Sequence, residues 1–192
     1  MNNNNKGYLH LILGPMFAGK STKLFNIIEN LKEKNESFLL IKHISDERYN
    51  SNTTNIITHD KKIMDCIGLD RLLNIIGDEK YINSKYIFID EGQFFPDIIK
   101  FIDIALEKDY KNIYITGLNG DSNRKPFHNI SKLISVADKV NILQSKCNYC
   151  ANKGIFTLRT VHKQKKILIG DDKIYKSVCR NHYVQYNDNF SK

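Results

Sequence analysis

The sequence lacks a long hydrophobic run, and this absence excludes a membrane-spanning helix. Its longest apolar stretches, such as 8–13 and 86–89, have the length of a β-strand, whereas a transmembrane helix needs about 20 apolar residues. Residues 1–6 are mostly asparagine and are not followed by the apolar segment of a secretory signal. We therefore expect a cytoplasmic protein in a reducing compartment, with no membrane partner.

Cysteine and arginine are both scarce. In a reducing compartment the four cysteines are better suited to metal binding than to disulfide bonds. Of the 29 basic residues only 5 are arginine and 24 are lysine, against 21 acidic residues. The net charge of +8 is compatible with a polyanionic partner, either nucleic acid or phosphates. A lysine excess is equally compatible with an AT-rich coding genome, so charge alone leaves the partner open.

Between residues 7 and 143 the sequence alternates strand patterns with helix patterns, which is typical of a parallel sheet covered by helices. Hydrophobic residues make up 41% and charged residues 26%, as in ordinary globular proteins. The expected strands are 8–13, 37–42, 86–89 and 112–116, and the expected amphipathic helices are 21–34 and a segment after Pro96. The fold class is therefore α/β.

From Gln144 onward the pattern breaks into short β-prone pieces that contain cysteine, glycine and lysine. These pieces are too small to form a hydrophobic core alone. We expect polar, disordered tails over 1–6 and 187–192, an α/β domain over 7–143 and a small β-rich module over 144–186.

Residues 14–21 match the phosphate-binding pattern G-x-x-x-x-G-K-[ST] at every position. Gly14 and Gly19 let backbone N–H groups turn toward phosphate oxygens. Lys20 would supply a cation to the β- and γ-phosphates, and Ser21 a hydroxyl ligand to Mg²⁺. Because the motif follows an expected strand and opens an expected helix, a chance glycine-rich turn is the weaker interpretation.

An acidic pair follows another expected strand. The apolar stretch 86–89 leads into Asp90 and Glu91, at the carboxyl end where open parallel sheets place reactive groups. Asp90 is suited to hold Mg²⁺, directly or through water. Glu91 could orient or deprotonate an attacking hydroxyl. The alternative for Glu91 is a solvated acid at a strand end, and its position suits either role.

Cys147-x-x-Cys150 and Cys179-x-x-His182 form two ligand pairs separated by a β-prone stretch. The pattern predicts a tetrahedral zinc site of three cysteines and one histidine. Because four protein ligands leave no open position on the metal, we expect a structural zinc that fastens this segment. The alternative is a set of free buried cysteines with His182 at the surface. Cys66 lies in an apolar segment, and we expect it to be a core thiol.

Several further segments occur in one order along the chain, between residues 7 and 183. They are the string Asp90–Asp97 and the pieces 48–49, 58–60 and 124–127, and Tyr175 stands shortly before the second ligand pair. With the phosphate-binding motif and the two ligand pairs, these segments resemble the type II thymidine kinases, of the cellular and poxvirus form. The string Asp90–Asp97 together with the ligand pairs carries the resemblance, and the phosphate-binding motif alone would not.

The resemblance implies an ATP-dependent kinase that uses Mg²⁺ to transfer the γ-phosphoryl group to the 5′-hydroxyl of thymidine, giving dTMP, with deoxyuridine as a further acceptor. It implies a RecA-like P-loop sheet flanked by helices, followed by the zinc module, whose "lasso" loop closes over the thymine. It also implies a homotetramer and feedback inhibition by dTTP. The partners are then ATP and thymidine, in place of nucleic acid.

Site residues carry over from the family position by position. Glu91 corresponds to the general base. The positions that correspond to ATP and phosphate contacts are Gly14, Pro15, Met16, Phe17, Ala18, Gly19, Lys20, Ser21, Asp46, Arg48, Asp90 and Gln93. The positions that correspond to the thymidine pocket are Met16, Leu118, Phe127, Thr157, Ile167, Leu168, Ile169, Gly170 and Tyr175. Ser21 and Asp90 are the expected Mg²⁺ ligands, as the residue chemistry already indicates.

The chain departs from the family pattern between residues 118 and 127. Where the family usually has an aromatic residue, this sequence has Ser122. The change removes a ring that would pack against the bound nucleoside, a contact worth on the order of 1 kcal/mol. We expect weaker binding of thymidine with unchanged chemistry, unless another side chain fills the gap.

A P-loop ATPase stimulated by nucleic acid, with a zinc ribbon, is the alternative function. The pair Asp90-Glu91 is similar to the acidic box of helicases, and the +8 charge would then serve a nucleic-acid clamp. The chain length leaves room for one ATP-binding lobe, and the few arginines make a poor backbone-binding surface. The lysines 163, 165 and 166 lack interleaved aromatic residues, so we expect them in a solvated loop.

Overall fold

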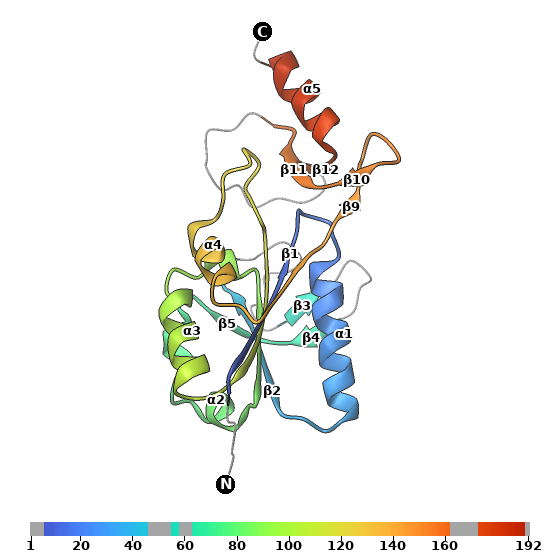
Figure 1. Ribbon diagram of the computed structural model, residues 1–192. Coiled ribbons are helices and arrows are strands. Elements are labelled where there is room, and N and C mark those ends of the chain that lie inside the picture. The colour runs from blue at the N-terminus through green and yellow to red at the C-terminus, as the bar shows by residue number, and fades with distance from the viewer. Residues whose placement is uncertain (1–5, 46–54, 58–62, 162–172, 191–192) are drawn as a thin grey trace.

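The structure, a computed structural model, describes residues 6–45, 55–57, 63–161 and 173–190 (Figure 1). A parallel sheet forms the centre, and a small C-terminal module lies beyond the carboxyl ends of its strands. The N-terminus lies at the opposite end of the sheet from the module. Among the described residues, no helix is long and apolar enough to cross a membrane.

Six strands form the central sheet in the order β5-β2-β6-β7-β1-β8, and all five pairings are parallel. Their bounds are Ile67–Leu69 (β5), Phe38–His43 (β2), Tyr86–Asp90 (β6), Asn112–Gly117 (β7), Tyr8–Leu13 (β1) and Lys139–Ile142 (β8). Because all strands point the same way, the residues that follow β1, β2, β6 and β7 meet at one edge of the sheet.

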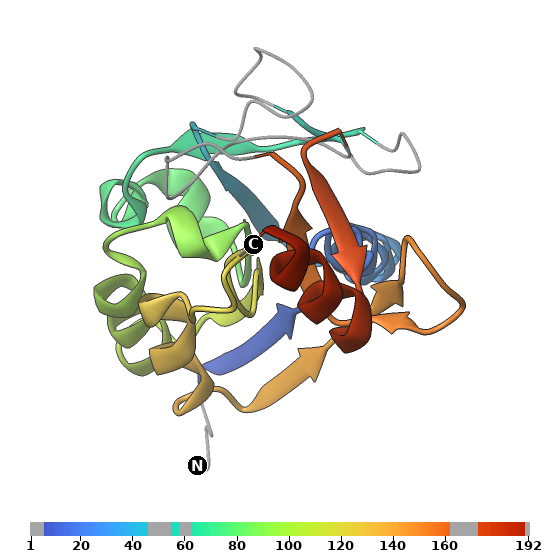
Figure 2. The ribbon, with the colours of Figure 1, turned by 90° about the horizontal axis from the view of Figure 1, so that it is seen from above.

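Helices cover both faces of the sheet (Figure 2). One face carries α1 (Lys20–Glu33) and the hairpin of β3 (Asn55–Ile57) and β4 (Ile63–Asp65). The other carries α2 (Glu79–Asn83), α3 (Ile98–Glu107), α4 (His128–Ile134) and the 3₁₀ turns η1 (Leu72–Ile75) and η2 (Gly92–Phe94). The sheet is therefore buried on both sides, which explains why its strands are continuously apolar.

Two hydrophobic clusters form the core, one on each face of the sheet. In β1 the side chains of Leu9, Leu11 and Leu13 enter the cluster under α3 and α4, and Ile12 enters the cluster under α1. In α1 the buried residues Leu24, Phe25, Ile28 and Leu31 share the face that meets the sheet. The alternating strand pattern and the helical spacing thus place apolar side chains where the topology needs them.

The C-terminal module consists of two short hairpins and a helix. Its bounds are Ser145–Lys146 (β9), Lys153–Gly154 (β10), Phe156–Arg159 (β11), Tyr175–Val178 (β12) and Arg180–Phe190 (α5). The pairs β9–β10 and β11–β12 are both antiparallel. The core of the module contains Leu158, Val178 and Tyr183 together with Cys147 and Cys179. With so few apolar side chains, the module needs a further source of stability.

The predicted elements are confirmed with shifts of one or two residues. The strand predicted over 8–13 is β1 itself, and the helix predicted over 21–34 is α1, which begins one residue earlier, at Lys20. The helix predicted after Pro96 is α3. Helix α5 continues to Phe190, so residues that we expected in a polar tail are helical. Cys66 is half-buried at the margin of the core rather than inside it.

Candidate active site

The phosphate-binding motif lies between the end of β1 and the start of α1, as predicted. Gly19 has φ 76°, a left-handed conformation that glycine adopts without strain. A side chain at Gly14 would come within 2.7 Å of the carbonyl oxygen of Leu143. Lys20 is only 6% exposed, and its Nζ donates to the carbonyl oxygen of Pro15 at 2.9 Å. The loop therefore keeps its cation beside the backbone that would surround a phosphate group.

Ser21 and Asp90 lie together at the carboxyl edge of the sheet. The Ser21 hydroxyl lies 3.3 Å from Oδ1 of Asp90 and donates to it. Asp90 is 3% exposed and ends β6, two strands away from β1. A hydroxyl and a carboxylate are the oxygen ligands that Mg²⁺ takes from proteins, so the donor set fits this metal.

Thr116, on β7, joins Asp90 to Glu91. Its hydroxyl donates to Asp90 Oδ1 and accepts the backbone N–H of Glu91 at 3.0 Å. Thr116 is completely buried, so water does not compete for these hydrogen bonds. The residue was not identified from the sequence, although a polar side chain at the end of an apolar strand was the available signal.

Glu91 is held in an unusual backbone conformation. Its φ of 53° is left-handed, which costs a residue with a side chain on the order of 1 kcal/mol. Its exposed fraction is 5%, and its carboxylate Oε2 accepts a hydrogen bond from the Gln93 side-chain amide. The carboxylate is therefore buried and oriented by a neighbour, rather than solvated as the alternative interpretation required.

Gln93 also reaches the loop after β7, which comprises residues 118–127. Its Oε1 accepts the backbone N–H of Leu118 at 3.2 Å. The same amide thus contacts the acidic pair and the beginning of this loop. Phe127 lies at the far end of the loop, just before α4, and packs against the larger core cluster.

Lys42 is a second charged residue that the sequence analysis missed. It lies on β2 opposite Asp90 in the strand register and is 5% exposed. A lysine this buried keeps its charge only with compensating groups nearby, and the carboxyl edge of the sheet offers such groups. As with Thr116, its position at the end of an apolar strand was the only signal in the sequence.

The four predicted metal ligands come together in the C-terminal module. The ligand atoms of Cys147, Cys150, Cys179 and His182 all lie within 4.8 Å of one another. Sγ of Cys150 lies 3.9 Å from Sγ of Cys179, and Nδ1 of His182 lies 3.6 Å from Sγ of Cys147. A zinc ion with Zn–S bonds of about 2.3 Å separates its tetrahedral ligands by about 3.6 to 3.8 Å, so the cluster fits zinc.

The electrostatics of the cluster favour the forms that bind metal. Burial opposes ionisation of Cys147, but hydrogen bonds from backbone N–H groups, first that of Cys179, lower its pKa to about 6. Hydrogen bonds to the His182 backbone and side chain lower the pKa of Cys179 as well. Thiolates are the form of cysteine that coordinates zinc.

The module contacts the phosphate-binding loop directly. The hydroxyl of Thr157, on β11, accepts the backbone N–H of Met16 at 3.0 Å, and both residues are buried. Tyr175 lies on the paired strand β12, opposite Arg159. The structure therefore brings together Met16 and Thr157, two of the residues that the resemblance assigns to the thymidine pocket.

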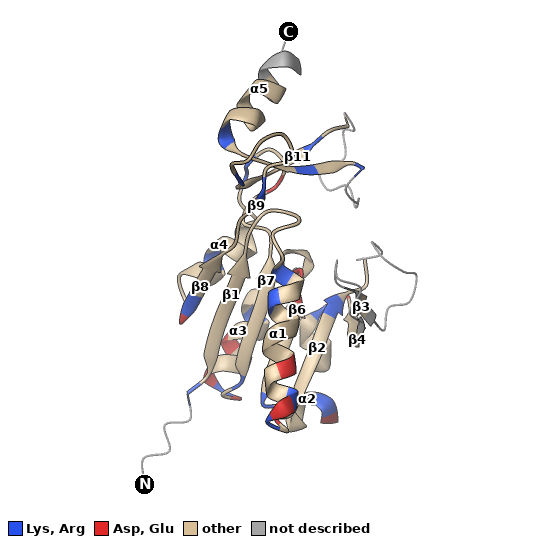
Figure 3. Ribbon diagram, turned by 90° about the vertical axis from the view of Figure 1, so that its right-hand side faces the viewer, with Lys and Arg blue, Asp and Glu red and all other residues tan. Residues whose placement is uncertain are grey.

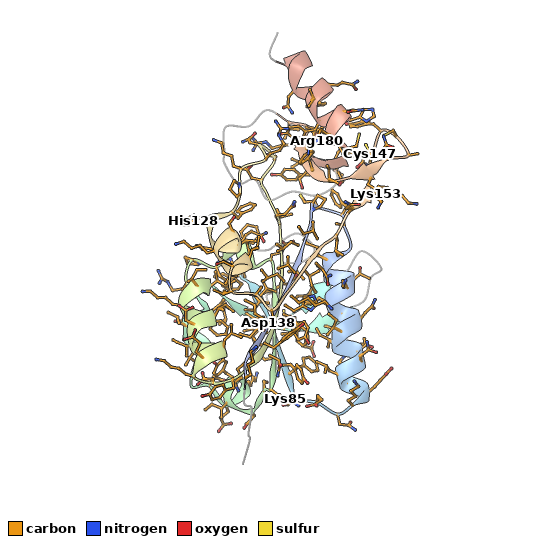
Figure 4. The ribbon with its side chains drawn as sticks, in the orientation of Figure 1. Lys85, His128, Asp138, Cys147, Lys153 and Arg180 are labelled. Atoms are coloured by element: carbon orange, nitrogen blue, oxygen red, sulfur yellow. The ribbon has the colours of Figure 1, made fainter. Side chains whose placement is uncertain are left out.

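A cavity of about 680 Å³ lies beside the phosphate-binding loop. Phe17, Ala18 and Gly19 form one wall, the chain from Ile142 to Lys146 forms another, and Lys153 contributes from β10. Figure 4 labels Lys153 near the junction of the module and the sheet. Basic side chains also occur in the first turn of α1 and across the module (Figure 3). The volume and the basic lining suit part of a nucleotide.

The remaining predicted site residues lie outside the described part of the chain. They are Asp46, Arg48, Ile167, Leu168, Ile169 and Gly170, together with the family segment 58–60. At Ser122 the structure describes a backbone carbonyl that contacts Tyr183. Weaker thymidine binding as a result of Ser122 stays a prediction.

Comparison with known proteins relates most of the chain to thymidine kinases. The family model described as thymidine kinase matches residues 7–183. A thymidine kinase of Yaba monkey tumor virus is 38% identical over 186 residues, which are 97% of this chain and 99% of the viral protein. A thymidine kinase of vaccinia virus (strain Ankara) is 35% identical over 180 residues, 94% of this chain and 98% of that protein. A rice thymidine kinase is 37% identical over 182 residues, and the match spans 66% of the plant protein.

Proposed function

The chain belongs to the thymidine kinase family, and on that premise we propose that it transfers the γ-phosphoryl group of ATP to the 5′-hydroxyl of thymidine, giving dTMP. One observation carries this proposal beyond the family relationship. The phosphate-binding loop, the Ser21–Asp90 pair and the buried Glu91 all lie at one edge of the sheet. A donor phosphate, its metal and a base can therefore act on a single acceptor hydroxyl.

The donor side of the reaction needs positioning and positive charge rather than covalent chemistry. Backbone N–H groups of residues 14–19 and the positive end of α1 would bind the phosphates. Lys20 would leave the Pro15 carbonyl and pair with the β- and γ-phosphates. Mg²⁺, held by Ser21 and Asp90, supplies further positive charge when it is bound. The cavity beside Gly19 is the space for the nucleoside part of ATP.

Glu91 is the proposed general base. Its carboxylate is buried and already oriented by Gln93, so little reorganisation is needed when the acceptor binds. The Glu91 backbone is fixed to Thr116, which also contacts the metal-binding carboxylate. The base and the metal ligand are thus linked through one buried hydroxyl. The proton of the 5′-hydroxyl would pass to Glu91 as the oxygen attacks the γ-phosphorus.

The acceptor would bind between the loop 118–127 and the C-terminal module. Leu118, Phe127, Thr157 and Tyr175 come from these two parts. Backbone groups near 167–170 would complete the thymine pocket, as the family resemblance implies. Hydrogen bonds from backbone to a pyrimidine edge give discrimination, because the wrong base leaves buried groups unpaired.

The zinc in this proposal is structural. It would join the ends of the module's strands and leave no coordination position for substrate. Thiolate ligands persist in reducing compartments, which supports a cytoplasmic location. The family resemblance supports a homotetramer and feedback inhibition by dTTP, which would compete for the same nucleotide-binding surfaces.

A product assay tests the proposal. Purified protein with ATP, Mg²⁺ and thymidine should form dTMP, and Lys20→Ala should abolish product formation because the phosphates lose their cation. Lys34→Ala, a variant of an exposed lysine just past the other end of α1, is the matched control and should keep full activity. ATP hydrolysis stimulated by DNA, without dTMP, would instead support the nucleic-acid-dependent ATPase.

A further inference from the structure

The tip of the loop 118–127 is attached to the C-terminal module. Tyr183, on α5, is 5% exposed, and its hydroxyl donates to the backbone carbonyl oxygen of Ser122 at 2.7 Å. The two residues are 61 positions apart in the sequence. Tyr183 directly follows His182, a member of the predicted zinc site. One helical turn thus carries a zinc ligand and a contact to the loop.

Arg124 strengthens the same attachment. Its guanidinium carbon lies 4.5 Å from the centre of the Tyr183 ring and 5.7 Å from the centre of the Phe156 ring. The two rings lie 5.3 Å apart at an angle of 56°. These distances are within the range of cation–π and aromatic contacts. We call Tyr183, Phe156 and Arg124 the aromatic clamp.

The clamp has its own support in the module. The guanidinium of Arg180 lies 5.0 Å from the Phe156 ring centre, so that ring contacts two arginines. Arg180 is labelled beside Cys147 in Figure 4. Zinc binding, the start of α5 and the position of the clamp rings are therefore parts of one small packed unit.

The tip of the loop is a closed turn that would respond as one piece. Oδ1 of Asp121 accepts the backbone N–H groups of Asn123 at 2.9 Å and Lys125 at 2.8 Å. The N–H of Arg124 donates to the Asp121 carbonyl oxygen at 2.9 Å. At its base, the loop is joined through Leu118 to Gln93 and from there to Glu91. The clamp therefore holds one end of a segment whose other end contacts the proposed base.

We propose that the aromatic clamp is a positioning device through which the C-terminal module holds the loop 118–127 in place for the acceptor nucleoside. The inference rests on the proposed function, since it assigns this loop to the acceptor side. A loop that is already held loses less conformational entropy when the acceptor binds. The clamp thus contributes to acceptor affinity and not to the phosphoryl-transfer step, which depends on Glu91 and the phosphate-binding loop.

The variant Tyr183→Phe tests the clamp with the smallest change, because it removes only the hydroxyl and keeps the ring. The matched control is Tyr186→Phe, on the same helix, whose hydroxyl donates at 3.1 Å to the Thr160 carbonyl oxygen inside the module. Hydrogen exchange measured by mass spectrometry should be faster over residues 118–127 in Tyr183→Phe than in wild type. It should be unchanged there in Tyr186→Phe. Zinc content should equal that of wild type in both variants.

Steady-state kinetics separate positioning from chemistry. Tyr183→Phe should raise KM for thymidine about fivefold with kcat within about twofold, the effect of losing one hydrogen bond. Arg124→Ala should raise KM by a similar factor, and Arg124→Lys should restore part of it by keeping a cation over the ring. Because Arg124→Ala keeps the Tyr183 hydroxyl, the two variants test separate contacts of the clamp.

Two results would overturn the inference. Equal exchange of residues 118–127 in Tyr183→Phe and Tyr186→Phe would show that the clamp does not hold the loop. A lower kcat with unchanged KM would show that it does not act on acceptor binding. If wild-type protein forms no dTMP, the proposed function fails, and the exchange comparison still decides whether the clamp holds the loop.

Discussion

At the scale of single residues, the carboxyl edge of the sheet depends on a few buried side chains that share hydrogen bonds. Thr116 contacts both members of the acidic pair, and Gln93 contacts Glu91 and Leu118. Because these groups are buried, each hydrogen bond both orients a neighbour and satisfies a polar atom that water cannot reach. Among the described residues, no buried side-chain nitrogen or oxygen lacks a partner.

Glu91→Gln tests the proposed base. The amide is nearly isosteric but accepts no proton, so kcat should fall about 100-fold or more, whereas ATP affinity measured by calorimetry should stay within about twofold. The control Glu33→Gln, at the last residue of α1, should keep wild-type kcat. An unchanged kcat in Glu91→Gln would remove this residue from the base role.

At the scale of elements, the edge strand β8 is joined to β1 by a buried histidine. His10 is 4% exposed, and its Nε2 and Oδ1 of Asn141 on β8 lie 2.8 Å apart, within hydrogen-bonding distance. Burial lowers the pKa of His10, and the positive charges of Lys139 and Lys23 lower it further, against the opposing effect of the Asn141 hydrogen bond. His10 is therefore neutral in the folded protein near pH 7.

Acidification should destabilise this pairing. The unfolded chain binds a proton at His10 near pH 6.5, above the lowered pKa of the folded state, so stability is present above that pH and is lost as the pH falls. Between pH 7.5 and 5.5 the free energy of unfolding, measured with urea, should fall by about 1 kcal/mol more in wild type than in His10→Gln. Equal losses in the two proteins would contradict the assignment, and the comparison cancels effects of other titrating groups.

Element positions were largely predictable because they depend on local periodicity. The apolar stretches that became β1, β2, β6 and β7 were each recognised within two residues of their observed ends. The short strands β3, β4, β5 and β10 were not predicted individually, because two or three residues carry no measurable period.

At the scale of the whole molecule, two contacts join the C-terminal module to the two sides of the proposed site. Thr157 contacts the phosphate-binding loop at Met16, and Tyr183 contacts the loop 118–127 at Ser122. The module therefore depends on its metal for stability and, in turn, touches both the donor side and the acceptor side. Loss of the metal should be felt at both.

Cys147→Ser tests the metal site at this scale. Zinc content measured by mass spectrometry should fall to background, and the melting temperature should drop by about 5 °C or more because metal binding contributes to folding free energy. Cys66→Ser changes the cysteine outside the cluster and should keep wild-type zinc content. Zinc retained in full by Cys147→Ser would argue against the four-ligand site.

The sequence by itself determined the features whose chemistry depends on neighbouring residues. The phosphate-binding motif, Asp90 with Glu91, and the two ligand pairs could each be recognised because spacing along a strand, turn or helix places their side chains. Only the tertiary structure decided that Thr116 joins Asp90 to Glu91 and that Tyr183 contacts Ser122, 61 residues away. Such contacts depend on strand order and on packing between elements, and no local period in the sequence encodes either.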